Sequence, residues 1–149
     1  MIAYHLCLDQ NNMPNKKQKF ILVNVDGQQY AVPLSSSYHF FHIRQITPIP
    51  QMDKRIIGFT YHNGHLVTLL DTAKIFTLMT KNSNEKCAMV KFDHHYYGWI
   101  IKSAGDIVSA ILNKSRTQDI LKEYILVNKK KIKVLEVKPV LKDINLDAK

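Results

Sequence analysis

Residues 46–76 read ITPIPQMDKRIIGFTYHNGHLVTLLDTAKIF, and this stretch combines several local structural signals in a fixed order. Its two prolines each fix φ and bias the preceding residue toward extended geometry, so we expect an extended entry segment. Asp53 is placed to cap a short helical turn over residues 54–57. Gly58 is the residue type that ends such a turn in the left-handed conformation.

A β-hairpin is predicted directly after this turn. Residues 59–61 and 66–70 are β-prone runs, and Asn63-Gly64 between them is the dipeptide best suited to a tight turn with positive φ. Asp71 then offers a second helix cap, for a short helix over 72–76 whose last two residues would close over one end of the hairpin. The predicted order is therefore extended segment, turn, strand, strand and turn.

The rest of the chain is predicted to be mostly strand. β-branched and aromatic residues separated by turn residues indicate further strands at 20–25, 29–34, 87–92, 96–102, 107–111, 124–128 and 132–137. Helix is limited to short pieces, one over 115–124 from the capping-box spacing of Ser115 and Gln118, and one over 139–144. Roughly nine or ten short strands with so little helix favour a barrel fold.

The order of motifs resembles the core of the CheW family of bacterial chemotaxis coupling proteins. The shared pattern is Thr-x-Ile-Pro from Thr47, Ile-x-Gly ending at Gly58, a strand, a glycine turn, and hydrophobic-Leu-Asp ending at Asp71. Weaker similarity extends to 20–34, 97–108 and 132–141. Because each motif alone is common in β proteins, the specificity of the resemblance lies in their order along the chain.

This resemblance implies a fold and a function. The fold would be two small five-stranded SH3-like barrels packed as one intertwined domain with short helices. The function would be that of a non-enzymatic adaptor in chemotaxis-type signal transduction. Its implied partners are the regulatory domain of a CheA-type histidine kinase and the cytoplasmic tip of a chemoreceptor, and no cofactor is expected.

The candidate partner-binding residues lie in two short segments where this chain departs from the family pattern. The family turn usually reads Asn-Leu-Arg-Gly, with the arginine implicated in receptor contact, whereas here the matching residues are Tyr61, His62, Asn63 and Gly64. The family also commonly has Val-x-Glu-Ile after the first hairpin, where this chain has Ser37-Tyr38-His39-Phe40. The residues that we expect to contact a partner are Ser37, His39, His62, Asn63 and Gly64.

The framework glycines and aspartate of the family pattern are retained at Gly58, Asp71 and Gly98. We therefore expect a retained fold with altered or specialised partners. A coupling protein for a divergent pathway, such as surface motility or pili, and a noncanonical scaffold are both open, as is a barrel that has lost both partners.

Length and composition favour one compact domain. The chain has 149 residues, 46% of them hydrophobic, without a low-complexity run or a detected internal repeat. We expect residues 1–18 to form a partly disordered lead and residues 19–146 to form the CheW-like domain. No run of about 18 apolar residues predicts a spanning helix, and residues 1–8 do not resemble a signal peptide, so a cytoplasmic location is expected.

Enzymatic and metal chemistry have weak support. The chain contains no GxSxG, HExxH or phosphate-loop motif, and Asp71, Asp93 and Asp106 are explained as cap or turn residues. His62 with His65, and the pair His94-His95, lack an identifiable third metal ligand. Two isolated cysteines, at positions 7 and 87, predict neither a disulfide nor a redox site in a cytoplasmic chain.

The net charge of +9 raises the alternative of a basic, small-barrel nucleic-acid-binding protein. Only Lys129-Lys130-Lys131 with Lys133 forms a tight basic cluster, at a predicted hairpin tip. Such a tip is most often a solvated turn that discourages edge pairing. Aromatic residues are not interleaved with the lysines in the sequence as a base-stacking surface requires, so the adaptor hypothesis is preferred.

Overall fold

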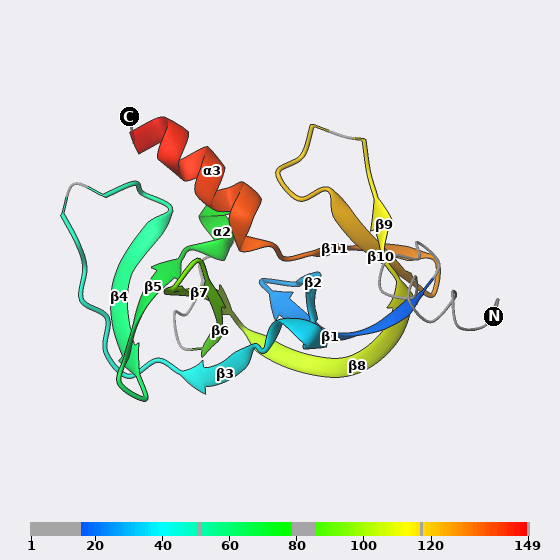
Figure 1. The fold of residues 1–149 in the computed structure, drawn as a ribbon, viewed down its shortest axis with the longest axis horizontal. Helices are drawn as coiled ribbons and strands as arrows, with labels where there is room; N and C mark the ends of the chain where they lie inside the picture. Colours follow the sequence, from blue (N-terminus) through cyan, green and yellow to red (C-terminus); the bar gives the residue numbers. More distant parts are fainter. Residues whose placement is uncertain (1–15, 51, 79–85, 117, 149) are drawn as a thin grey trace, which may run out of the picture.

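The computed structural model describes residues 16–50, 52–78, 86–116 and 118–148, and it is built mainly of short strands (Figure 1). The strands are β1 Lys17–Val25, β2 Gln28–Pro33, β3 His39–His42, β4 Ile56–His62, β5 His65–Leu70, β6 Lys86–Phe92, β7 His95–Ile101, β8 Ser103–Ile111, β9 Asn113–Lys114, β10 Glu123–Val127 and β11 Lys130–Val134. The helical elements are the 3-10 turn η2 Leu34–Ser36, α2 Thr72–Ile75 and α3 Val137–Ala148.

The strands form two sheets that exchange segments. Sheet order is β8-β1-β2-β11-β10-β9 in the first and β3-β6-β7-β5-β4 in the second, and we call these barrel 1 and barrel 2. After β2 the chain crosses to barrel 2 through β3, and after β7 it crosses back through the long, curved β8 (Figure 1). The predicted mostly β fold of two intertwined SH3-like barrels is confirmed, with the two-residue strand β9 giving barrel 1 a sixth strand.

Three groups of buried side chains hold this arrangement together. Phe20 and Ile125 belong to the interior of barrel 1, and Val67 and Ile100 to the interior of barrel 2. The third and largest group, which includes the fully buried Trp99, joins outward-facing residues of both sheets to α3. Because side chains alternate between the two faces of a strand, each sheet contributes one face to its own barrel and the other face to the contact between barrels.

The helix α3 is fixed to barrel 2 by apolar and charged contacts. Val137, Val140 and Ile144 are buried in the central group of side chains. The guanidinium of Arg55, the residue directly before β4, forms ion pairs with Asp53 and with Asp143 of α3. The Arg55 guanidinium also holds the pKa of Asp53 down at about 2. The helix thus ties the end of barrel 1 to barrel 2, because only two residues separate it from β11.

Several element predictions are confirmed and others are wrong. The Asn63-Gly64 turn has φ of 50° and 80°, and Asp71 caps α2 by accepting a hydrogen bond from the Lys74 amide at 3.2 Å. The helix expected over 139–144 is longer, since α3 spans Val137–Ala148. The sequence analysis missed β3 and β9, because four-residue and two-residue strands carry too little periodicity to detect.

The helical turn predicted over 54–57 is wrong. The Asp53 side chain does accept a hydrogen bond from the Arg55 amide. However, the Ile56 amide donates to the Asp53 carbonyl and closes a single turn, and β4 begins at Ile56. The amide of Asp71, which directly follows β5, donates a hydrogen bond to the Arg55 carbonyl at 2.8 Å. This bond extends the β4–β5 pairing to the residue before β4. Gly58 therefore lies inside a strand, at an irregularity in the β4–β5 register, and does not end a helix.

The helix predicted over 115–124 is also wrong. Within residues 115–116 and 118–124 the described backbone is a loop that leads into β10. The Ser115 amide donates to the Lys122 carbonyl at 2.6 Å, which continues the antiparallel pairing of β9 with β10. Leu121 is buried in the central group, so tertiary burial overrides the local capping signal.

Replacing Lys129 with glycine is expected to stabilise the protein by about 0.5 kcal/mol. In the β10–β11 turn, Lys129 has a φ of 67°, a left-handed conformation that is costly for residues with a Cβ atom. Urea unfolding of the two proteins measures the difference. The matched control is Lys130→Gly, which lies in β11 and is expected to destabilise by about 1 kcal/mol. A lower free energy of unfolding for Lys129→Gly would contradict this account of the turn.

Candidate protein-docking surface

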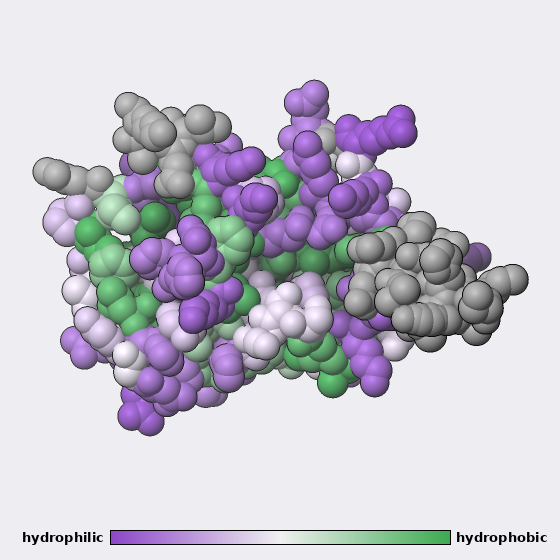
Figure 2. Space-filling view, in the orientation of Figure 1, coloured by the Kyte–Doolittle hydropathy of each residue, from purple (hydrophilic) through white to green (hydrophobic). Residues whose placement is uncertain are grey.

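The tip of the β4–β5 hairpin carries an exposed hydrophobic pair. Tyr61 is 72% exposed and faces Leu66 across the hairpin, which is 45% exposed. These two side chains and the turn residues His62, Asn63 and Gly64 are called the tip patch. Figure 2 shows hydrophobic residues over the barrel on the left, bordered by hydrophilic residues at the lower left, where the hairpin ends in Figure 1. A small apolar centre with a polar border is typical of a protein-docking surface.

The structure brings two of the separate candidate segments together. The His62 ring stacks on Phe41 of β3, with ring centroids 3.9 Å apart and planes 6° apart. His39 is exposed and lies two residues before Phe41, so both side chains are on the same face of β3. Since β3 and β4 are opposite edges of the second sheet, this contact is made where barrel 2 closes. The tip patch therefore continues onto β3 toward His39.

Ser37 lies further back along the connection between the barrels. Its backbone is left-handed, with φ 53°, and its side chain is exposed immediately after η2. Only three residues separate Ser37 from Phe41, so Ser37 lies at the edge of the surface formed by β3 and the hairpin tip. Its position on an exposed crossover is compatible with a contact at the border of a partner interface.

The sequence analysis missed the hydrophobic residues of this surface. Tyr61 and Leu66 each alternate with a buried neighbour, Thr60 and Val67, and that period-two pattern would have assigned both to the outer face of the hairpin. Tyr96 was missed as well. Its ring lies 4.3 Å from the His65 ring, and Lys91 Nζ lies 5.8 Å from the Tyr96 ring centroid. This second stacked pair extends the polar border toward β7.

The three framework residues occupy positions with narrow steric or hydrogen-bonding requirements. A Cβ atom at Gly58, where φ is 153°, would lie 2.2 Å from the Thr47 carbonyl oxygen. A Cβ atom at Gly98 would lie 2.2 Å from the Cys87 sulfur. Asp71 caps α2, as described above. These residues shape barrel 2 and so position the tip patch.

The described part of the chain contains neither a cluster of metal-ligating side chains nor an exposed cysteine thiol. Among residues 16–50, 52–78, 86–116 and 118–148, no group of three or more His, Cys, Asp and Glu side chains is arranged to hold a metal ion. Cys87 is buried, and burial raises the pKa of its thiol far above the ordinary value. Cys7 lies outside the described residues. Among the helices that are described, none has the length and apolar character needed to span a bilayer.

The lysine cluster of the β10–β11 hairpin is partly occupied by intramolecular contacts. Lys131 Nζ lies 4.4 Å from the Tyr124 ring centroid, and Lys133 Nζ forms an ion pair with Asp119 at 2.9 Å. The fold thus places an aromatic ring beside the lysines, which the sequence order did not indicate. One face of this ring is already covered by a lysine side chain.

Comparison with known proteins identifies the domain. The family model described as "CheW-like domain" matches residues 19–141. The crystal structure of the scaffolding protein TtCheW from Thermoanaerobacter tengcongensis superposes with a TM-score of 0.72 at 15% sequence identity, covering 84% of this chain and 90% of that one. No curated protein matches this chain in sequence. The fold agrees with the structural match and the family model covers most of the chain, so this protein is a member of the CheW-like domain family.

Proposed function

We propose that this protein is a non-enzymatic, cytoplasmic adaptor in a chemosensory signalling array, whose CheW-like domain spans residues 19–146 after an N-terminal lead of residues 1–18. Its direct partner is the regulatory domain of a CheA-type histidine kinase. Membership of a family that includes a scaffolding protein supports this role. The observation that carries the proposal is the exposed Tyr61–Leu66 pair on a rigid hairpin.

The tip patch has the physical character that such an adaptor needs. Exposed large side chains contribute most of the free energy of binding when a partner buries them, and tyrosine is among the residues most often found at such positions. The hairpin turn is held by Asn63 and Gly64 in left-handed conformations, and the His62–Phe41 stack fixes it against β3. A rigid hairpin loses little conformational entropy on binding, which favours affinity.

Replacing Tyr61 with glutamate is expected to weaken binding to the kinase regulatory domain by at least about 30-fold. The change places a charge where the interface would be apolar. Calorimetric titration of the full chain with the regulatory domain from the same cell measures the affinity. Because Tyr61 is exposed, the thermal midpoint of the variant should stay close to that of the wild type.

The other hairpin offers a matched control. Leu126 is 54% exposed. It is the second-to-last residue of β10 before the hairpin turn, the same position that Tyr61 has in β4. Leu126→Glu is expected to leave the affinity within about twofold of the wild type. An equal loss in both variants would place the interface elsewhere. A wild-type protein that binds no such kinase domain would overturn the proposed function.

The receptor contact is tested in the same assay with a chemoreceptor tip fragment. Asn63 occupies the turn position at which the family pattern has the arginine, and asparagine offers no positive charge. Asn63→Arg is expected to strengthen receptor binding relative to the wild type. Identical receptor affinities would show that the receptor contact does not use this turn.

A single-stranded oligonucleotide titration tests the alternative function. The adaptor proposal predicts no saturable binding at physiological salt. Tight binding whose logarithm falls steeply with the logarithm of salt concentration would favour a nucleic-acid partner instead.

A further inference from the structure

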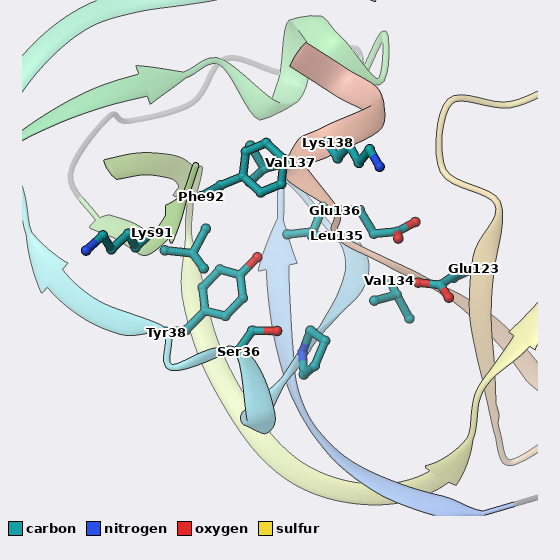
Figure 3. Close-up of a pocket in the computed structure, with 12 residues that line it drawn as sticks. Ser36, Tyr38, Lys91, Phe92, Glu123, Val134, Leu135, Glu136, Val137 and Lys138 are labelled. Atoms are coloured by element: carbon teal, nitrogen blue, oxygen red, sulfur yellow. The ribbon is translucent and has the colours of Figure 1, made fainter. Parts of the chain in front are cut away.

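Two glutamates from different elements lie together at the joint between the barrels. Glu123 begins β10 of barrel 1, and Glu136 lies in the short connection from β11 to α3. Both line a cleft of about 370 Å³ that is also lined by Val90 and Phe92 of barrel 2, and Phe92 lies across the cleft from the two glutamates (Figure 3). Both also line an adjoining cavity of about 390 Å³ next to α3. In Figure 3 the two carboxyl groups lie close to each other at the border of the cleft.

The position of Glu136 has a counterpart in barrel 2 with a different role. There the β4–β5 hairpin is followed by Asp71 and then α2, just as the β10–β11 hairpin is followed by Glu136 and then α3. Asp71 accepts a hydrogen bond from the Lys74 amide and caps its helix. The Glu136 carboxyl instead lies beside the Glu123 carboxyl (Figure 3). The acidic residue between hairpin and helix therefore caps the helix in barrel 2, whereas in barrel 1 it contacts a residue of β10.

Two adjacent carboxyl groups make a hydrogen bond only when one of them holds a proton. The pKa of Glu136 is raised to about 7. Partial burial is the main cause, hydrogen bonding to Glu123 and the Glu123 charge act in the same direction, and the Lys114 charge acts in the opposite direction. Below that pH the protonated Glu136 donates to Glu123. Above it the two carboxylates repel each other, since like charges at short range are unfavourable.

The charged and titratable groups around the pair come from several elements. They are Lys114 of β9, Lys122 before β10, Lys91 of β6, Lys138 and Lys142 of α3, and Tyr38 of the crossover to β3. Burial raises the pKa of Tyr38 to about 12, so this hydroxyl stays neutral near pH 7. The raised pKa of Glu136 places the change of its charge near neutral pH.

We propose that Glu123 and Glu136 form a pH-sensitive latch, which holds the first turn of α3 against barrel 1 while the pair shares a proton and releases it when both groups are ionised. The consequence for the fold follows from what α3 contacts. Val137, Val140 and Ile144 pack in the central group that also contains Trp99. Release of the latch would therefore loosen α3 and open the cleft between the barrels. This device is independent of which partner the tip patch binds.

The direction of the pH effect follows from proton binding. A carboxyl with a raised pKa in the folded state holds its proton between the ordinary value and the raised one, so folding is favoured at lower pH in that window. Stability from the latch is thus fully present below about pH 4.5 and is lost as the pH rises through about 7. The ion pair of Asp53 with Arg55 has the opposite pH dependence, because acid protonates the carboxylate and so weakens the pair.

Hydrogen exchange of the full chain at pH 6 and pH 8 tests the latch. After correction for the intrinsic exchange rates, protection of the amides in residues 137–144 is expected to fall about tenfold or more between the two pH values in the wild type. Glu136→Gln removes the ionisable group, so its protection should be the same at both pH values. Asp106→Asn, an exposed carboxyl on β8, is the matched control and should keep the wild-type change.

A second variant and a second signal make the test decisive. Glu123→Gln removes the neighbouring charge but leaves Glu136 partly buried, so it should weaken the pH dependence and move its midpoint to lower pH, and it can be measured if Glu136→Gln fails to fold. Trp99 is the single tryptophan of the chain, so its fluorescence reports on the central group, and a titration with a midpoint near pH 7 is expected only in the wild type and Asp106→Asn. Equal protection at both pH values in the wild type, or an unchanged pH dependence in both glutamine variants, would overturn the proposal.

Discussion

Replacing Gly58 with alanine is expected to lower the free energy of unfolding by about 4 kcal/mol. The new Cβ atom would lie 2.2 Å from the Thr47 carbonyl oxygen and 2.9 Å from its carbon. Both atoms are backbone, and they are fixed because the Thr47 and Phe59 backbones exchange two hydrogen bonds of 2.8 Å. A φ of 153° adds strain for any residue with a side chain. Relief would require breaking the contact between the entry segment and β4.

Urea denaturation of Gly58→Ala and two glycine controls measures this effect. Gly105→Ala on β8 places its Cβ atom 3.6 Å from the Leu22 carbonyl oxygen, an ordinary contact, and is expected to change stability by less than about 0.5 kcal/mol. Gly64→Ala meets no atom within 4 Å but has a φ of 80°, so a loss of about 1 kcal/mol is expected. If Gly58→Ala lost no more than Gly64→Ala, the steric explanation would be wrong.

Gly98→Ala is expected to cost about 3 kcal/mol, for a different reason. Its backbone is unstrained, but the Cβ atom would lie 2.2 Å from the Cys87 sulfur, with Val67 and Leu69 side chains at 3.1 and 3.2 Å. All three neighbours are fully buried inside barrel 2, so none can move into solvent. The cost is overpacking in an interior that is already filled.

Removing the sulfur should rescue this variant. Cys87→Ala alone is expected to cost about 1 kcal/mol, because it leaves a small void. In the double variant the new methyl group occupies part of that void, so the total loss should be about 2 kcal/mol smaller than the sum of the single losses. Denaturant melts of the four proteins complete the cycle. Additive losses would show that Cys87 is not the group that excludes a side chain at position 98.

Local sequence signals predicted the elements that depend on a few adjacent residues. Asn63-Gly64 specified its turn because that pair adopts positive φ at low cost, and Asp71 specified the start of α2 because its side chain reaches an amide three residues later. The same kind of signal failed at Asp53 and over 115–124. In both places, strand pairing with distant residues and burial of apolar side chains outweighed a local cap.

An internal repeat was not detected in the sequence, but the strand pairing reveals one. The β4–β5 hairpin and α2 correspond to the β10–β11 hairpin and α3, and β5 and β11 each pair in parallel with the second strand of another hairpin, β7 and β2. The two copies share strand pattern and connection rather than side chains, since packing needs only apolar residues of suitable size at alternate positions. Sequence comparison within the chain is insensitive to that kind of similarity.

The amino-acid sequence by itself determined the strand-rich character, the hairpin at Asn63-Gly64, the helix cap at Asp71 and the family resemblance, because turn chemistry and period-two patterns act over a few residues. Only the tertiary structure decided that Tyr61 and Leu66 form one exposed pair, that His62 rests on Phe41, and that Glu123 meets Glu136. Those contacts join residues far apart in the chain or on separate strands, and they arise when the exchange of β3 and β8 closes both barrels around a shared interior.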